Sequence, residues 1–229
     1  MCLRLNVVVP VHNEVAALPA LLGYLSELQR VHGVEVLVVD GGSDDGSANL
    51  LRAADCPSAT APLGRASQMN AGAQMGQGAA ILFLHADTSL PSDTCEQIET
   101  ALDAGAVGGF FRLRLDSPRP LLRLVGWMIT QRSRLTGIAT GDQALFVRRD
   151  AFEELGGFAP LPLFEDVEFC ARLGRVGSIA PLPGTVTTSA RRWEALGPLR
   201  TVVRMWLLRA GYWIGLSPHT LARYYEASR

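Results

Sequence analysis

Short apolar runs alternate with helix-like spacing over the first half of the chain. Residues 3–11, 34–39 and 79–84 are predominantly apolar, and runs of this length are typical of strands buried on both faces of a parallel sheet. Between the first two runs, leucines recur three or four residues apart, which predicts an amphipathic helix: Leu18, Leu21, Leu22, Leu25 and Leu28. This alternation predicts an α/β fold with a mainly parallel sheet flanked by helices.

The pattern changes near residues 105–109. Residues 110–116 alternate between apolar and charged side chains, which predicts a half-exposed strand. Farther on, we expect a helix over 121–129, a loop over the Gly- and Thr-rich residues 134–141 and a short strand over 144–147. We interpret the two parts as halves of one domain.

Polar side chains follow three of the expected strands. The first strand ends near Pro10, which cannot donate to a ladder, and is followed by Asn13 and Glu14; the second ends in Asp40, and the third runs into His85-Ala86-Asp87. Ligands of open α/β sheets bind outside the carboxyl ends of the strands. Each end alone is explained by a turn or a helix cap, with Asn13 as the cap and Glu14 in the first turn. Three in succession predict a shared ligand site.

Two of these strand ends carry candidate metal chemistry. Along a strand, His85 and Asp87 point to the same side, and an imidazole with a carboxylate suits Mn²⁺ or another borderline divalent metal. The simpler reading is a polar strand end that caps the next helix. In the loop 40–45, two adjacent glycines allow a ligand to approach the backbone. The three carboxylates of that loop repel one another unless a cation or a sugar hydroxyl relieves them, and a polar turn remains the plainer reading.

Two later segments carry charged groups. Residues 164–169 follow two prolines, so a helix is expected to begin near Glu165, and the helix dipole by itself would stabilise its carboxylates. The side chains of adjacent helical residues point about 100° apart, so Glu165 and Asp166 cannot both accept the same proton. In Arg191-Arg192-Trp193 the arginines suit phosphate and the tryptophan offers a stacking face, whereas a surface arginine pair beside a core tryptophan is the plainer explanation.

Four segments together resemble the nucleotide-sugar half of family-2 glycosyltransferases with the GT-A fold: Val9–Glu14, Val39–Gly46, Gly64–Gly72 and His85–Asp87. Their order and spacing match, and the likeness runs from about Leu3 to Trp193. It implies one GT-A domain over residues 1–193, with a nucleotide-sugar half over 1–109 and an acceptor half over 110–193. The remaining residues, 194–229, are expected to form a helical C-terminal tail.

A narrower likeness rests on two short segments. Gly141-Asp142-Gln143 and Arg191-Arg192-Trp193 are similar to those of a small bacterial subgroup, the arsenosugar-biosynthesis-associated glycosyltransferases. We treat this as a hint about grouping and not as evidence for an arsenic substrate.

The family resemblance implies a role for each candidate residue. Asn13, Glu14 and Asp40 would hold the base and the ribose, and the implied donor-binding set is completed by Pro10, Gly42, Arg65, Asn70, Ala86, Arg192 and Trp193. Asp87 would be the ligand of Mn²⁺ or Mg²⁺, and His85 stands where the family has the first Asp of its Asp-x-Asp motif. Asp166 aligns with the catalytic base, and Glu165 would orient the acceptor.

The resemblance implies an inverting, metal-dependent transfer of one sugar from a nucleotide-diphosphate sugar, with UDP favoured, to a hydroxyl acceptor that is a small molecule or lipid-linked. Such a transfer needs one carboxylate to take the proton from the attacking hydroxyl. Ser189 replaces the Gln of the Gln-x-x-Arg-Trp motif of processive members, which argues against polymerisation.

Two other functions stay open. A sugar-phosphate nucleotidylyltransferase needs a glycine-rich loop and a Lys or Arg soon after the first strand, and residues 11–20 offer none. A non-catalytic nucleotide-sugar-binding protein would keep the first three motifs without requiring Asp166.

The distribution of charge along the chain indicates which kinds of ligand it can bind. The chain of 229 residues has a formal net charge of −1, but residues 1–110 carry 12 acidic and 4 basic side chains, and residues 111–229 carry 10 acidic and 17 basic ones. An acidic part suits a metal and a basic part suits phosphates. The chain contains no Lys, which excludes Schiff-base chemistry on lysine and a Walker-type loop. Nucleic acid is not expected as a partner, because the basic residues form no concentrated tract.

Cysteines and the start of the chain suggest the compartment. Cys2, Cys56, Cys95 and Cys170 show no paired spacing, which predicts neither a disulfide framework nor a zinc site and fits a reducing compartment. An Arg and an Asn interrupt any apolar start, so we expect no signal peptide and a cytoplasmic protein.

Residues 205–214 of the tail are apolar and aromatic, but they are too few to cross a bilayer, and Arg209 interrupts them. On a helical wheel Arg200 and Arg204 lie together with Arg209 opposite, so the expected helix is not cleanly amphipathic. Two readings stay open. The helix packs on the domain with Arg209 paired to a carboxylate, or it binds weakly to the inner face of a membrane through its aromatic residues.

Overall fold

In residues 4–54 and 56–226, which the computed structural model describes, eight strands form one sheet in the order β3-β2-β1-β4-β7-β6-β8-β5. The strands are β1 Leu5–Val11, β2 Glu35–Asp40, β3 Ser58–Thr60, β4 Ala80–Phe83, β5 Thr88–Ser89, β6 Gly108–Asp116, β7 Phe146–Arg148 and β8 Ile179–Ser189. Leu3, where the first strand was expected to begin, and Cys2 lie outside the described residues.

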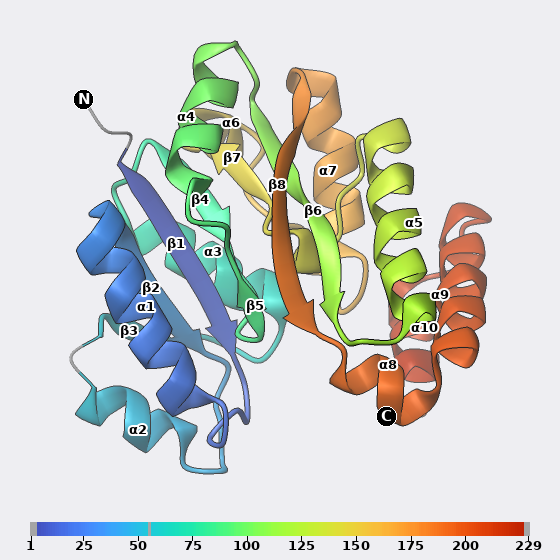
Figure 1. The fold of residues 1–229 in the computed structure, drawn as a ribbon, viewed down its shortest axis with the longest axis horizontal. Helices are drawn as coiled ribbons and strands as arrows, with labels where there is room; N and C mark the ends of the chain where they lie inside the picture. The colour runs from blue at the N-terminus through green and yellow to red at the C-terminus, as the bar shows by residue number, and fades with distance from the viewer. Residues whose placement is uncertain (1–3, 55, 227–229) are drawn as a thin grey trace.

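Helices cover both faces of this sheet (Figure 1). The helices are α1 Leu18–His32, α2 Ser47–Ala53, α3 Arg65–Met75, α4 Thr94–Asp103, α5 Pro120–Thr136, α6 Arg149–Glu154, α7 Glu165–Val176, α8 Arg191–Leu196, α9 Pro198–Trp213 and α10 Pro218–Glu226, with a 3₁₀ turn, η1, at Gly141–Gln143. Helices α1, α2 and α4 contribute to the core on one face, and α3, α6 and α7 to the core on the other. The predicted α/β architecture is confirmed.

Strand β1 shows why a continuous apolar run was the right signal. Val7 and Val9 enter the core beneath α1, whereas Val8 enters the opposite core beneath α3. The strand pairs in parallel with both β2 and β4, so no face of it meets water. Helix α3 packs closely on this strand, because a Cβ at Gly72 would lie 2.3 Å from the Val8 side chain.

The second half adds antiparallel strands. β7 pairs antiparallel with both β4 and β6, and β6 pairs in parallel with β8. The expected loop over 134–141 is wrong in its first part, because α5 continues to Thr136 and ends at Gly137 in the left-handed region, with φ 69°. Tertiary hydrogen bonds hold the last turns of α5: Thr130 Oγ1 accepts from the Leu113 amide at 3.0 Å, and Ser133 Oγ donates to Gln143 Oε1 at 2.7 Å.

The C-terminal helices continue from the end of β8. Val202 of α9 packs on Leu122 and Val125 of α5, and Leu221 of α10 belongs to a buried cluster with Leu208 of α9 and Phe164. Within the described part of the chain, no helix combines the length and the apolar character that a membrane span requires.

Candidate active site

The loops after β1 and β2 are tied together. The Asn13 amide donates to Ser43 Oγ at 2.9 Å, and Asn13 Oδ1 accepts from the Asp44 amide at 3.0 Å. The Glu14 amide donates to Ser47 Oγ at 3.0 Å. The expectation that Asn13 caps a helix with Glu14 in its first turn is wrong: α1 begins only at Leu18, and Asn13 has a left-handed φ of 54°. Asn13 therefore joins the loop after β1 to the loop after β2.

Asp40 is buried at the end of β2 and organises the loop behind it. Its carboxylate accepts hydrogen bonds from the Gly42 amide at 3.1 Å and from the Ser43 amide and hydroxyl. These donors stabilise the charge of the Asp40 carboxylate. From α3, Gln68 Nε2 donates to the carbonyls of Val11 and Val39 at 2.7 and 2.8 Å, which fixes the carboxyl ends of β1 and β2 side by side.

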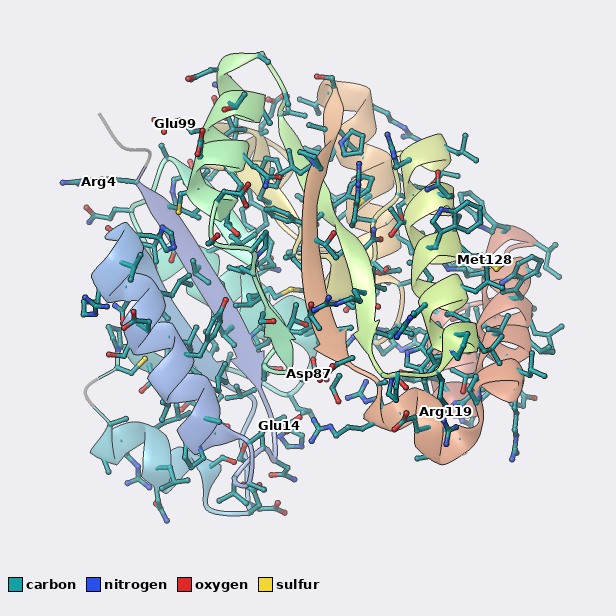
Figure 2. All side chains as sticks on the ribbon, in the orientation of Figure 1. Arg4, Glu14, Asp87, Glu99, Arg119 and Met128 are labelled. Atoms are coloured by element: carbon teal, nitrogen blue, oxygen red, sulfur yellow. The ribbon has the colours of Figure 1, made fainter. Side chains whose placement is uncertain are left out.

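Arg191 lies between two carboxylates at this edge of the sheet. Its Nη2 is 3.5 Å from Glu14 Oε2 and 4.0 Å from Asp87 Oδ2, and Figure 2 shows Glu14 and Asp87 at the same end of the molecule. The other oxygen of Asp87 accepts from Thr188 Oγ1 at 3.2 Å. The sequence pointed to Arg192 for phosphate contact; the structure adds its neighbour, which only the fold brings to Glu14.

His85 and Asp87 do not share one strand face as expected. β4 ends at Phe83, and the next residues turn back, because the Thr88 amide donates to the His85 carbonyl at 3.1 Å. Side-chain alternation therefore stops before His85. Its imidazole lies against Gly141, where a Cβ would come within 2.5 Å of Nε2. Burial, with Arg65 and Arg192 nearby, holds the pKa of His85 well below its usual value, so the imidazole is neutral.

The residues present fit a metal that is shared with a bound diphosphate. Among the described residues, no three His, Cys, Asp or Glu side chains form a group that would hold a metal alone. Mg²⁺ in phosphate-binding sites, however, uses only one or two protein carboxylates and completes its shell with phosphate and water. Asp87 offers such a carboxylate, because its side chain is 29% exposed and its Oδ2 is 4.0 Å from Arg191 Nη2, beyond hydrogen-bonding distance. Asp87 therefore suits Mn²⁺ or Mg²⁺. The His85 side chain lies against Gly141 instead.

The carboxyls of Glu165 and Asp166 lie at the start of α7, which confirms the expected helix start. The Gly141 amide donates to Asp166 Oδ2 at 2.8 Å, and the Val167 amide donates to Oδ1 at 2.7 Å. Burial raises the pKa of Asp166 despite these hydrogen bonds. Burial and the charge of Asp166 raise the pKa of Glu165 to about 7. His85, Gly141, Glu165 and Asp166 line one small cavity.

Asp142 is a third carboxyl that reasoning from the sequence did not assign to chemistry. Burial, hydrogen bonding to Thr140 and the charge of Asp166 act on it, and the net effect raises its pKa. Its buried Oδ1 has no hydrogen-bond partner in the described residues, and the same holds for Nε of the nearby Arg132. Asp142 could have been noticed from the sequence because it lies in Gly141-Asp142-Gln143, but we used that segment only for the family resemblance.

The other candidates divide into two groups. Arg65 and Arg192 act electrostatically on His85, and Pro10 and Ala86 belong to the strand end and the turn already described.

Asn70 instead donates to the Phe158 carbonyl and accepts from its amide, both at 2.9 Å. Trp193 packs on a hydrophobic cluster with α5, as in the plainer explanation. Asn70 and Trp193 thus support the site through the fold.

Glu165→Gln is expected to reduce the pH dependence of stability. Because folding raises the pKa of Glu165 from 4.5 to about 7, the native state holds a proton that the unfolded chain releases in this window. The free energy of unfolding therefore falls as pH rises from about 4.5 to about 7. The variant should be more stable than wild type by about 1–3 kcal/mol at pH 8, as measured by urea unfolding.

The exposed Glu154→Gln is the matched control and should leave the pH profile of stability unchanged. Parallel profiles for wild type and Glu165→Gln would show that Glu165 titrates as an ordinary carboxyl.

Solved structures with this architecture are glycosyltransferases of the GT-A type. The structure superposes on "Mannosyltransferase PcManGT from Pyrobaculum calidifontis in complex with GDP-Man and Mn2+" with a TM-score of 0.63 and 21% sequence identity, covering 82% of this chain and 57% of that one. For S. aureus TarS 1-349 the TM-score is 0.62 at 16% identity, with 82% and 60% covered. At these identities the likeness establishes the fold.

The chain belongs to glycosyl transferase family 2, whose sequence model matches residues 6–156. A relative from Pseudomonas fluorescens, named "Undecaprenyl-phosphate 4-deoxy-4-formamido-L-arabinose transferase", is 32% identical over 160 residues, which cover 62% of this chain and 45% of the relative. The protein of that name from Aeromonas hydrophila is 33% identical over 124 residues, covering 49% and 38%. This chain therefore spans less than half the length of these two relatives.

Proposed function

We propose that this glycosyltransferase moves a single sugar, with inversion at its anomeric carbon, from a nucleotide-diphosphate sugar to a hydroxyl acceptor and depends on Mn²⁺ or Mg²⁺. The observation that carries the proposal is the shared cavity of His85, Glu165 and Asp166, because it joins the turn after β4 to a candidate base on α7. The donor is assigned to residues 1–109 and the acceptor to residues 110–193.

The donor half is proposed to bind the nucleotide sugar through the two hydrogen-bonded loops that follow β1 and β2. Asn13, Glu14 and Asp40 would line the place for base and ribose, with Gly42 allowing close approach of the backbone. Arg191 and Arg192 would contact the diphosphate, since guanidinium groups pair with phosphate oxygens in a bidentate manner. A metal held by Asp87 would supply Lewis-acid neutralisation of the leaving group.

Asp166 is proposed to take the proton from the attacking hydroxyl. The amides of Gly141 and Val167 orient its carboxylate, and burial raises the basicity of the group. Glu165, with a pKa of about 7, would hold a proton in part of the molecules at neutral pH. It would then donate a hydrogen bond to the acceptor without competing for the transferred proton.

We propose UDP as the nucleotide and a lipid-linked or small-molecule acceptor. TarS is known in complex with UDP-GlcNAc and the mannosyltransferase with GDP-Man, so the fold serves both nucleotides. The names of the relatives include undecaprenyl phosphate, which supports a lipid-linked acceptor. The reaction would take place in the cytoplasm, at the inner face of the membrane for a lipid-linked acceptor. The subgroup likeness at Gly141–Gln143 concerns grouping only.

The test is release of free nucleotide from UDP-, GDP- and dTDP-sugars with Mn²⁺, with and without undecaprenyl phosphate or simple sugars as acceptors. Metal-dependent release from one nucleotide class, increased by an acceptor, is the expected result. Binding of a nucleotide sugar with no release under any condition would favour the non-catalytic binding protein. Conversion of the nucleotide sugar and pyrophosphate into nucleoside triphosphate and sugar 1-phosphate would favour the nucleotidylyltransferase.

A further inference from the structure

Exposed apolar side chains are concentrated on two neighbouring helices. Leu121, Leu124, Trp127, Met128 and Leu135 are exposed on α5, and Leu199, Val203, Trp206, Leu207 and Trp213 are exposed on α9. We call these ten residues the α5–α9 face. The two helices lie side by side at one end of the sheet (Figure 1), and Figure 2 places Met128 at that end, away from Arg4 and Glu99.

Helix α9 is apolar on two sides. Leu208, Met205 and Tyr212 face the molecule and pack with α7 and α10, whereas the α9 part of the α5–α9 face points outward, with Trp206 65% and Leu207 67% exposed. This explains why the sequence pattern was not cleanly amphipathic. The expected pairing of Arg209 with a carboxylate is not seen among the described residues.

The charges around this face are predominantly positive, although Glu194 lies 3.9 Å from Arg119. Residues 117–141 and 195–225 contain no Asp or Glu. They contain eight arginines: Arg119, Arg123, Arg132, Arg134, Arg200, Arg204, Arg209 and Arg223. An exposed apolar stripe of this extent marks an interaction surface, and a surface that is apolar and predominantly cationic is complementary to anionic lipid.

An apolar cavity of about 710 Å³ opens beside the face, between α9 and α10. Leu199, Val203 and Leu207 belong both to the face and to the lining of the cavity, and Leu221 and Tyr224 line it from α10. A hydrocarbon chain that leaves the bilayer at this point would remain in apolar surroundings.

We propose that the α5–α9 face rests on an anionic membrane surface and that a lipid hydrocarbon chain enters the cavity between α9 and α10. This inference rests on the proposed function, because a membrane surface would bring the enzyme to a lipid-linked acceptor. Binding to the membrane itself needs no sugar donor. Because α5 lies within the glycosyltransferase domain, the surface is not confined to the tail.

The experiment is co-sedimentation of the full chain with phosphatidylglycerol vesicles and with phosphatidylcholine vesicles, at low and high salt. Trp127→Ser and Trp206→Ser should each lower partitioning onto phosphatidylglycerol by about tenfold. Arg123→Gln and Arg200→Gln should each lower it about fivefold at low salt, and less at high salt because of screening. The exposed Leu63→Ser and Arg175→Gln, on other elements, are the matched controls and should bind as wild type does.

Several results would overturn the proposal. These are no binding to phosphatidylglycerol at low salt, equal binding to both lipids, loss in the tail variants alone, or a dimer in sedimentation velocity that Trp127→Ser dissociates. Thermal unfolding of each variant shows that the fold is kept. Nucleotide release from the soluble donor, measured in parallel, should be unchanged in Trp127→Ser. If vesicle binding fails while release persists, this inference fails and the proposed function stands.

Discussion

Asp166→Asn is expected to lower turnover by about 10²-fold or more while donor affinity changes only a few-fold. The amide keeps the shape of the carboxylate but cannot accept the proton of the attacking hydroxyl. The orienting Gly141 amide, 2.8 Å from Oδ2 in the wild type, can still donate to the new side-chain oxygen. Turnover comes from steady-state nucleotide release, and donor affinity comes from calorimetry with the unreactive nucleotide diphosphate.

The pH dependence of the wild-type turnover rate is an independent test of the role of Asp166. Burial raises the pKa of Asp166, so the acid limb of the wild-type rate should lie at higher pH than for an ordinary Asp, and the rate should rise as pH increases through it. Asp103→Asn, at the exposed end of α4, is the matched control. Near-normal turnover of Asp166→Asn would identify Asp166 as a structural acceptor for the Gly141 amide and place the base elsewhere.

Asp87→Ala is expected to abolish measurable transfer and to weaken UDP binding mainly when Mn²⁺ is present. In the wild type, Asp87 Oδ2 lies 4.0 Å from Arg191 Nη2, which is 3.5 Å from Glu14 Oε2. Without it, a metal would keep only the phosphate oxygens and water as ligands, and the several kcal/mol of charge stabilisation that metals provide would be lost. Calorimetric titration of UDP with Mn²⁺ and with EDTA measures the effect.

The contrast between the two titrations decides the role of Asp87. The wild type should bind UDP more tightly with Mn²⁺ than with EDTA, and Asp87→Ala should bind equally under both conditions. Asp103→Ala serves as the control that keeps the wild-type difference. Equal UDP affinity of the wild type with and without Mn²⁺ would falsify the assignment of Asp87 as a metal ligand.

Local sequence patterns were sufficient where the physical cause is itself local. A strand buried on both faces is predominantly apolar, so β1, β2 and β4 were visible as short apolar runs. The start of α7 at Glu165 was visible because prolines precede it. These features also located the site, since the carboxyl ends of neighbouring parallel strands lie at one edge of the sheet.

Contacts between distant segments were decided by the tertiary structure alone. Arg191 reaches Glu14 and Asp87 because β8 ends beside the turn after β4, and no spacing in the sequence distinguishes it from Arg192. Asn13 appeared to be a helix cap until the fold showed its partner, Ser43, thirty residues away. Pairing across such separations depends on how the elements pack.

The sequence by itself therefore determined the α/β fold, the family and the edge of the sheet that carries the chemistry, because periodicity and motif order are properties of neighbouring residues. Only the tertiary structure decided that Asp142 joins Asp166 in a buried carboxyl cluster and that α5 shares an exposed apolar face with α9. Burial raises the pKa of a carboxyl, and exposed apolar side chains form a continuous surface, only after the fold has determined which side chains lose contact with water.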